Sequence, residues 1–263
     1  MKVVILCGGL GTRLREETEF RPKPMVEIGG RPILWHIMKI FATQGLRDFV
    51  LCLGYRGNMI KEYFLNYEAM NNDVTVQLGA RTKVSYHGEH DEQDYTVTLV
   101  NTGAKAQTGA RIKRVQRFAT GEGVGGRCVV TYGDGLTDID LKALLGFHES
   151  HRRLATVTTV RLPGRFGSVE LGDDGRVLNF REKPAHDAWI SAGFMVFERG
   201  VFDYLQDDDG CILEREPMER LARDGQLMAY RHHGEFYPMD TYRDHVALNE
   251  LWDAGKAPWR IWK

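Results

Sequence analysis

The first half of the chain alternates short apolar runs with segments whose apolar residues recur every three or four positions. The runs 3–7 (VVILC) and 48–55 are continuously apolar or nearly so, whereas 32–45 and 57–67 have helical periodicity. Continuous apolar runs separated by amphipathic helices are typical of parallel strands that are covered on both faces. We therefore predict a doubly wound sheet in this half.

The segment 32–45 has the clearest helix signals. Pro32 suits a first helical turn, and Gly45 suits a C-terminal cap. Four apolar residues at helical spacing predict one buried stripe: Ile33, Ile37, Ile40 and Phe41.

Residues 73–100 alternate polar and apolar positions at both ends of a polar middle. This pattern predicts strands that pair across an exposed β excursion at about 76–98. The turn Asp173–Asp174–Gly175 predicts a hairpin over 168–184.

The remaining patterns indicate further strands and helices. We expect strands over 127–135, 155–163 and 189–197, helices over 140–151 and around 217–223, and a C-terminal helical segment around 240–263. No internal repeat or low-complexity linker interrupts the chain. We therefore predict a single domain over 1–263: an α/β, Rossmann-like, doubly wound mixed sheet, mostly parallel, with small β insertions.

Composition narrows the classes of function. Of the 263 residues 43% are hydrophobic and 27% are charged, and the formal net charge is −1, which argues against disorder and against nucleic acid as a partner. The four cysteines are widely spaced, and three lie in apolar runs, so we expect buried, reduced thiols and a cytoplasmic location. We expect no signal peptide, because the apolar run 3–7 is shorter than the apolar core of roughly 7–15 residues that such a peptide needs. We expect no membrane partner, because no apolar run reaches the roughly 18 residues of a membrane span.

A glycine-rich loop, GGLGTRL, follows the first apolar run. Gly8, Gly9 and Gly11 permit backbone conformations and close approaches that a Cβ would block, and such a loop presents N–H groups to an anion. Arg13 and Lys23 add two cations near it. The Lys-Ser/Thr ending of a Walker loop is absent, and the dinucleotide fingerprint is broken at its third glycine, which argues against a dinucleotide oxidoreductase.

Two aspartates are candidate metal ligands. Asp134 directly follows the apolar strand at 127–135, at the carboxyl end where open α/β sheets bind ligands. If Asp240 of the PMDT segment folds back beside it, the two carboxylates make a hard oxygen site that suits Mg²⁺ together with phosphate oxygens and waters. Either aspartate alone would more often be a turn residue.

Other features carry less chemistry. Two histidine pairs with three-residue spacing, His87 with His90 and His148 with His151, are interpreted as surface residues rather than metal ligands. The tryptophans at the C-terminal end are expected to pack on their own domain or on a neighbouring subunit rather than on a sugar: Trp252, Trp259 and Trp262.

Several motifs together resemble the sugar nucleotidyltransferases, also called nucleoside-diphosphate-sugar pyrophosphorylases: LCGGLGTRL, RPKPMVEIGGRPIL, YGDG, FREKP and PMDT. Within that superfamily, LGYRGNMIKEYF, TGARIKRV, PGRFGSVEL and PMDTYRDH are most similar to the glucose-1-phosphate cytidylyltransferases. The resemblance spans nearly the whole chain. It implies a fold of the nucleotide-diphospho-sugar transferase type, Mg²⁺ as cofactor, and CTP and a sugar 1-phosphate as substrates.

The resemblance also implies roles for particular residues. Those implied to bind the nucleotide are Leu6, Cys7, Gly8, Gly9, Leu10, Gly11, Thr12, Arg13, Lys23, Arg111 and Gly133. Those implied to bind the sugar phosphate are Glu182, Lys183, Ser191 and Gly193, and those implied to be catalytic are Arg13, Lys23, Asp134 and Asp240, the two aspartates on the metal. One departure concerns the sugar pocket, where the chain has Ser191, Ala192 and Gly193 in place of an Asn-Gly-Gly type segment.

The resemblance implies that CTP and α-D-glucose 1-phosphate give CDP-glucose and pyrophosphate by direct in-line displacement, in nucleotide-sugar biosynthesis. Two anions must meet in this reaction, so catalysis would rest on positioning and charge neutralisation. The same reaction with UTP, dTTP or another sugar 1-phosphate stays open, and so does a non-catalytic nucleotide-binding, regulatory relative. We expect a homo-oligomer.

Overall fold

The computed structural model describes residues 1–79, 82–120, 126–161, 168–171, 176–181 and 188–262. Its centre is a seven-stranded sheet in the order β14-β10-β13-β8-β1-β4-β7. The strands, in chain order, are β1 (Lys2–Cys7), β4 (Asp48–Leu53), β7 (Thr96–Asn101), β8 (Cys128–Tyr132), β10 (Ala155–Val160), β13 (Ile190–Phe197) and β14 (Leu227–Arg231).

The sheet is mixed and mostly parallel, as predicted. β1 pairs in parallel with both β4 and β8, β4 with β7, and β10 with β14. Only β13 runs antiparallel to its neighbours in this sheet, β8 and β10. The carboxyl ends of β8, β1, β4 and β7 therefore lie along one edge of the sheet, which is where the cavity described below is found.

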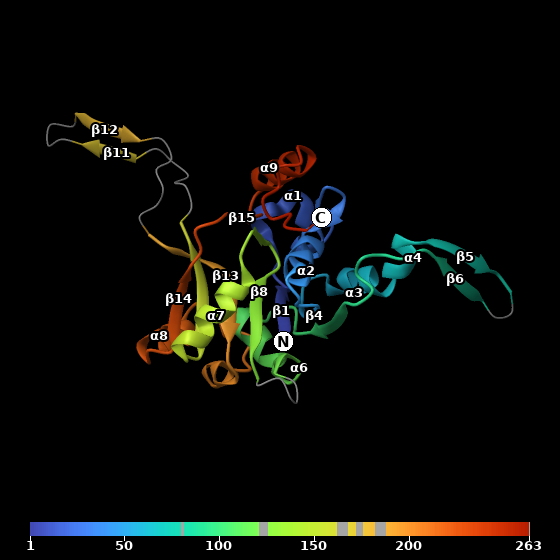
Figure 1. Ribbon diagram of the computed structural model, residues 1–263, viewed down its shortest axis with the longest axis horizontal. Helices are drawn as coiled ribbons and strands as arrows, with labels where there is room; N and C mark the ends of the chain where they lie inside the picture. Colours follow the sequence, from blue (N-terminus) through green and yellow to red (C-terminus); the bar gives the residue numbers. More distant parts are fainter. Residues whose placement is uncertain (80–81, 121–125, 162–167, 172–175, 182–187, 263) are drawn as a thin grey trace.

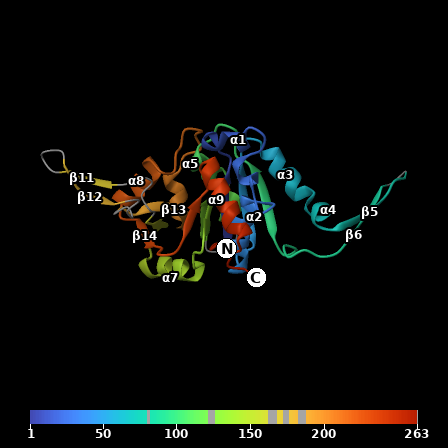
Figure 2. The same cartoon turned by 90° about the horizontal axis from the view of Figure 1, so that it is seen from above.

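Helices cover both faces of the sheet (Figures 1 and 2). They are α1 (Arg15–Thr18), α2 (Ile33–Thr43), α3 (Gly57–Leu65), α4 (Tyr67–Asn71), α5 (Thr108–Arg114), α6 (Gln116–Ala119), α7 (Leu141–His151), α8 (Glu216–Arg223) and α9 (Tyr242–Asp253). One core contains side chains of α2, α7 and α9, and the other contains side chains of α5, α6 and α8. Successive residues of β1 alternate between these cores, so this strand is buried on both sides.

The predicted helices are present with small shifts at their ends, except that the C-terminal helix, expected around 240–263, ends at Asp253. Helix α2 begins after Pro32, and Gly45 follows it with a φ of 91°. All four residues of the predicted stripe are fully buried. The sequence patterns did not predict α5, α6 or β14.

The prediction of strands pairing across 76–98 is wrong in its partners. β5 (Asp73–Gln77) pairs with β6 (Lys83–His87) in a separate hairpin, whereas β7 joins the main sheet beside β4. The hairpin stands out from the body of the molecule (Figure 1). The alternation of polar and apolar residues indicates that a segment is a strand, but it does not show which other strand that segment pairs with.

Three smaller pairs of strands complete the chain. β2 (Glu27–Ile28) pairs with β3 (Arg31–Pro32), β9 (Gly135–Thr137) with β15 (Phe236–Pro238), and β11 (Ser168–Leu171) with β12 (Val177–Arg181). The last pair is the hairpin predicted over 168–184, and its turn at 173–175 lies outside the described residues.

Several side-chain expectations can be compared with the structure. Cys7, Cys52 and Cys128 are buried and free, as predicted. His148 is not a surface residue: it is 1% exposed and lies within hydrogen-bond distance of Thr156 and Glu198. The helical periodicity of 140–151 places His148 on the inner face of the helix. The surface prediction was wrong because it was based on the polar character of the side chain.

The C-terminal tryptophans pack on their own domain. Trp259 is fully buried in the core that contains α2, and its ring lies edge-on to His36. Trp252 and Trp262 contact the same histidine ring. In the part of the chain that the structure describes, no helix has the length and apolar character needed to cross a bilayer.

Candidate nucleotide and metal site

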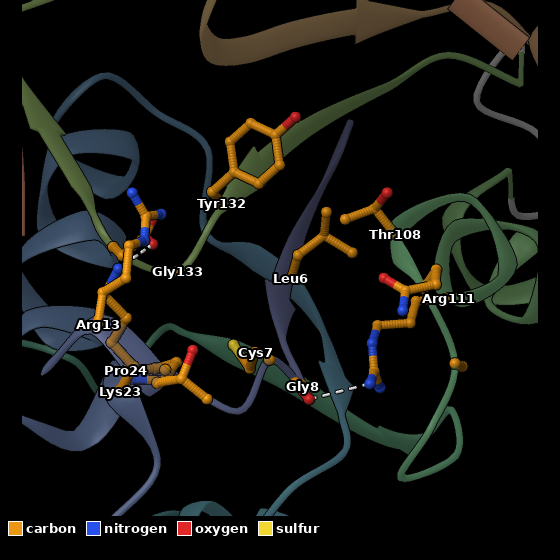
Figure 3. Close-up of a pocket in the computed structure, with 16 residues that line it drawn as sticks. Leu6, Cys7, Gly8, Arg13, Lys23, Pro24, Thr108, Arg111, Tyr132 and Gly133 are labelled. Carbon is orange, nitrogen blue, oxygen red and sulfur yellow. Dashed lines mark hydrogen bonds and ion pairs between the residues drawn. The ribbon is translucent and has the colours of Figure 1, made fainter. Parts of the chain in front are cut away.

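A cavity of about 280 Å³ opens at the carboxyl ends of β1 and β8 (Figure 3). The glycine-rich loop after β1, the first turn of α5 and the end of β8 form its walls. Ten of the residues singled out in the sequence line it: Leu6, Cys7, Gly8, Gly9, Gly11, Thr12, Arg13, Lys23, Arg111 and Gly133. Asp134 lines it as well.

The structure explains two glycines of the loop, Gly8 and Gly11, whereas a Cβ on Gly9 would meet nothing within 4 Å. A Cβ on Gly8 would lie 2.1 Å from the guanidinium of Arg111, and Gly11 has a φ of 65°. A Cβ on Gly133 would lie 2.8 Å from the carbonyl oxygen of Leu6. Leu10 differs from its neighbours, because its side chain is 59% exposed and does not line the cavity.

Arg111 is buried and binds the protein itself. Its Nη2 donates to the carbonyl oxygen of Gly8 (2.9 Å). Its Nη1 lies within hydrogen-bond distance of the carbonyl oxygens of Leu53 (3.1 Å) and Gly103 (2.8 Å) and of the hydroxyl of Thr102 (2.8 Å). The guanidinium thus holds the glycine loop against the ends of β4 and β7, in addition to facing the cavity.

Four charged side chains from distant parts of the sequence converge beside the loop. Lys23 Nζ donates to Asp134 Oδ2 (2.6 Å) and to Asp240 Oδ1 (3.0 Å). Arg13 contacts both oxygens of Asp240 at 2.9 Å. The Lys23 side chain is 11% exposed, so the two carboxylates converge on a cation that is largely shielded from water.

The pairing of β9 with β15 explains why Asp240 reaches Asp134. β9 begins directly after Asp134, β15 ends two residues before Asp240, and Pro238 stands opposite Gly135 in the register. The N–H of Met239 also donates to the carbonyl oxygen of Asp134 (2.9 Å). The condition set by the sequence, that the PMDT segment folds back beside Asp134, is therefore met.

Helix α9 fixes the other side of Asp240. Thr241 and Asp244 form a capping box, in which the Asp244 side chain accepts from the Thr241 N–H (2.8 Å). The same carboxylate accepts from the Asp240 N–H (3.1 Å), so the backbone on which Asp240 stands is tied to the helix.

Cys7 lies in the cavity wall but is unsuited to nucleophilic chemistry. Its side chain is fully buried, and this burial raises the pKa of the thiol well above its ordinary value. A thiol that stays protonated is a poor nucleophile.

The residues expected around the sugar phosphate are only partly described. Ser191 lies near the start of β13 with its side chain exposed, and Gly193 has a φ of 76° and is close to the ring of Tyr132. Glu182 and Lys183 lie outside the described residues.

Sequence reasoning missed several residues of the cavity wall: Pro24, Ala106, Gln107, Thr108 and Tyr132. Two of them belong to motifs that were recognised: Pro24 ends RPKP, and Tyr132 begins YGDG. The other three precede or open α5, and the TGARIKRV segment that begins this helix was the signal that could have placed them.

Comparisons with known proteins identify the family of this chain. A profile of the nucleotidyl transferase family matches residues 2–254. The chain is 48% identical to the glucose-1-phosphate cytidylyltransferase of Salmonella typhi over the whole of both chains. It is 40% identical to the probable glucose-1-phosphate cytidylyltransferase of Bacillus subtilis, again over the whole of both chains.

The fold is also found in solved structures. A putative glucose-1-phosphate thymidylyltransferase from Bacillus anthracis superposes with a TM-score of 0.70 at 17% identity, over 100% of this chain and 98% of that one. At that identity the likeness concerns the fold alone, which is the nucleotide-diphospho-sugar transferase type expected from the sequence.

Proposed function

The chain belongs to the nucleotidyl transferase family, and from that premise we propose that it transfers a cytidylyl group from CTP to α-D-glucose 1-phosphate, giving CDP-glucose and pyrophosphate. The observation that carries the proposal is the full-length identity of 48% to a curated enzyme of that name. The cavity at the ends of β1 and β8, with its glycine loop and its cluster of cations and carboxylates, supports it.

We propose that the triphosphate lies along the glycine loop. The N–H groups of a glycine turn can surround phosphate oxygens, and Arg13 and Lys23 supply positive charge beside them. Arg111 then acts mainly by holding Gly8, since its guanidinium already has four acceptors in the protein.

The donor set fits Mg²⁺, which is our proposal for the cofactor. Asp134 and Asp240 both direct oxygens at Lys23 Nζ, a cation that stands between them. No group of three or more histidine, cysteine, aspartate or glutamate side chains suited to a metal occurs among the described residues. Two carboxylates completed by phosphate oxygens and waters are typical of Mg²⁺ sites. When bound, the ion would neutralise charge on the phosphates.

The mechanism that we propose is direct in-line displacement at the α-phosphorus by a phosphate oxygen of the sugar 1-phosphate, with pyrophosphate as the leaving group. The nucleophile is already an anion at neutral pH, so no general base is required. The chain's contribution is to hold the two anions in line and to neutralise them through Lys23 and Arg13. Lys183 is proposed to bind the phosphate of the sugar phosphate, with Glu182, Ser191 and Gly193 around the sugar.

Pyrophosphate release tests this function. With Mg²⁺ present, the purified protein is given each of CTP, UTP, dTTP and GTP in combination with glucose 1-phosphate and mannose 1-phosphate. We expect turnover with CTP and glucose 1-phosphate at the highest kcat/KM. Turnover with another nucleotide alone would refute the cytidylyl assignment, and nucleotide binding without any turnover would favour a regulatory relative.

We also propose that the protein is a cytoplasmic homo-oligomer. The β5–β6 hairpin has one apolar face whose four side chains are 41–48% exposed: Val74, Val76, Val84 and Tyr86. A two-stranded hairpin that stands alone is only marginally stable, and an exposed apolar face of this kind favours contact with a second copy. Light scattering coupled to size-exclusion chromatography tests this, and a monomeric mass at micromolar concentration would contradict it.

A further inference from the structure

A carboxylate outside the cavity connects two of its walls. Glu214, in the loop before α8, accepts a hydrogen bond from Tyr132 Oη at Oε1 (2.5 Å) and one from Thr108 Oγ1 at Oε2 (2.6 Å). Tyr132 ends β8, Thr108 begins α5, and both line the cavity. Glu214 itself does not line it, so its effect on a ligand must pass through these two side chains.

Both side chains are fixed by more than Glu214. The hydroxyl of Thr108 accepts from the N–H of Leu213 (2.9 Å) while it donates to Glu214, which leaves it one orientation. The ring of Tyr132 lies against Gly193, where a Cβ would come within 2.8 Å of Cδ2. One edge of the Tyr132 ring is therefore packed against Gly193, and Glu214 fixes the position of its hydroxyl group.

The loop that carries Glu214 is anchored on α5. The N–H of Gln107 donates to Asp209 (2.9 Å), and that of Ala110 donates to Cys211 (3.1 Å), in both cases to the carbonyl oxygen. Arg114 adds ion pairs to Asp207 and Asp209. Because this loop is fixed on α5, its carboxylate joins α5 to the strand β8, which leads into Asp134.

The bridge lies at one end of the cavity. Figure 3 shows Leu6 between Gly8 and Cys7 on one side and Tyr132 and Thr108 on the other. Gly8 and Cys7 of the glycine loop, along which we propose that the phosphates lie, are thus separated from Tyr132 and Thr108 by Leu6. The nucleoside is the part of the nucleotide left for the Tyr132 and Thr108 end.

We propose that Glu214 is a positioning residue that holds Tyr132 and Thr108 as the wall against which the nucleoside of the bound triphosphate lies. This inference rests on the proposed function for the identity of the ligand. It predicts an effect on nucleotide affinity that is separable from effects on the phosphates and on the reacting atoms.

The test compares Glu214→Ala and Glu214→Gln with Glu216→Gln, an exposed glutamate two residues along that pairs with Arg220. We expect Glu214→Ala to raise the KM for CTP about tenfold, with kcat within twofold. In the reverse reaction, the KM for CDP-glucose should rise in parallel, and the KM for pyrophosphate should stay unchanged. Glu214→Gln, which keeps one acceptor, should lie between, and Glu216→Gln should match the wild type.

A double-mutant cycle separates positioning from general destabilisation. If Glu214 acts through the tyrosine hydroxyl, Tyr132→Phe combined with Glu214→Ala should raise the KM by less than the product of the single effects. Melting temperatures of all variants serve as the control for folding. Fully independent effects, an unchanged KM for CTP, or an equal rise in the KM for pyrophosphate would each overturn the inference.

Calorimetry of CTP binding to the wild type and to Glu214→Ala tests the inference separately from the proposed function. A wild-type protein that binds CTP but does not turn it over would refute the cytidylyltransferase, and about tenfold weaker CTP binding by Glu214→Ala would then still support the positioning role. A wild-type protein that does not bind CTP would overturn both.

Discussion

At the scale of single residues, one buried guanidinium joins the carboxyl ends of three strands. Arg111 is 4% exposed and binds carbonyl groups of the loop after β1, of the end of β4 and of the segment after β7. The guanidinium of arginine presents several donors in a fixed plane, which the ammonium of lysine cannot reproduce.

We predict that Arg111→Lys lowers the free energy of unfolding by about 1–3 kcal/mol, because buried carbonyl groups lose their donors. The KM for CTP should rise as the loop at Gly8 loosens. Urea unfolding and steady-state kinetics measure the two effects. Arg114→Lys, in the same helix but with surface ion pairs, is the matched control and should cost less than about 1 kcal/mol. Equal costs in the two variants would contradict a special role for Arg111.

A second prediction at this scale follows from the proposed neutralisation of phosphate charge. Arg13→Ala and Asp240→Ala should each lower kcat by roughly 10²–10³, if each stabilises charge in the transition state. Arg15→Ala, in an exposed position two residues after Arg13, should leave kcat within about twofold and is the control. Wild-type turnover in either of the first two variants would remove that residue from the mechanism.

Sequence alone singled out residues whose motif contained the chemical reason for them. A run of glycines that precedes an arginine can be recognised in the sequence, and so can an aspartate that follows an apolar strand. Glu214 is not, because its partners Thr108 and Tyr132 are 106 and 82 positions away and nothing around it marks a function. The structural role of Arg111 was missed for the same reason, since its four acceptors come from three separate segments.

At the scale of elements, the cap of α9 links the stability of the helix to the position of Asp240, which we propose to be catalytic. Asp244 closes the capping box and also binds the N–H of Asp240. Asp244→Ala should lower the free energy of unfolding by about 1 kcal/mol and should lower kcat several-fold as Asp240 loses its support.

Asp140→Ala is the matched control for this cap. Asp140 caps α7 by accepting from the N–H of Ala143 (3.0 Å) and does not line the cavity. Its loss should lower stability by a similar amount and leave kcat unchanged. A parallel loss of kcat in both variants would show that stability, rather than the position of Asp240, controls the rate.

The packing of α2 predicts a pH dependence of stability. His36 is fully buried among the rings of Trp252 and Trp259, its Nε2 donates to the carbonyl oxygen of Ile28 (2.8 Å), and its burial lowers the pKa from 6.5 to about 4. Between these values the unfolded chain binds a proton that the native protein does not. Stability should therefore fall as the pH drops from 6.5 towards 4, by about 3 kcal/mol from this residue.

Unfolding of the wild type and of His36→Gln at pH 7 and pH 4.5 measures this contribution. The loss on acidification should be smaller in the variant by about 2 kcal/mol or more. An NMR titration of the imidazole in the native protein gives an independent check. An imidazole that titrates near pH 6.5 in the folded state would contradict the prediction.

Element type was more predictable than element pairing. The stripe of α2 and the runs of β1 and β4 are local patterns, and they form as predicted. The partner of β5 was not predictable, because β6 and β7 were alternating segments of similar character and only the position of β4 decides that β7 belongs to the main sheet.

At the scale of the whole molecule, the β5–β6 hairpin decides the state of assembly if our proposal is correct. Val84→Asp places a charge on the apolar face, and we expect it to lower the mass measured by light scattering. Ser85→Asp places the same charge on the opposite face and should leave the mass unchanged. A mass that responds equally to both substitutions would contradict an interface on the apolar face.

The β9–β15 pairing has a consequence for the order of events during synthesis. The last strand of the seven-stranded sheet ends at Arg231, before either β15 or Asp240 has been made. Lys23 must then wait for a partner 217 positions away. All the strands of this sheet therefore leave the ribosome ahead of Asp240, and the cluster of charged side chains around Lys23 is completed only after β15 has been made.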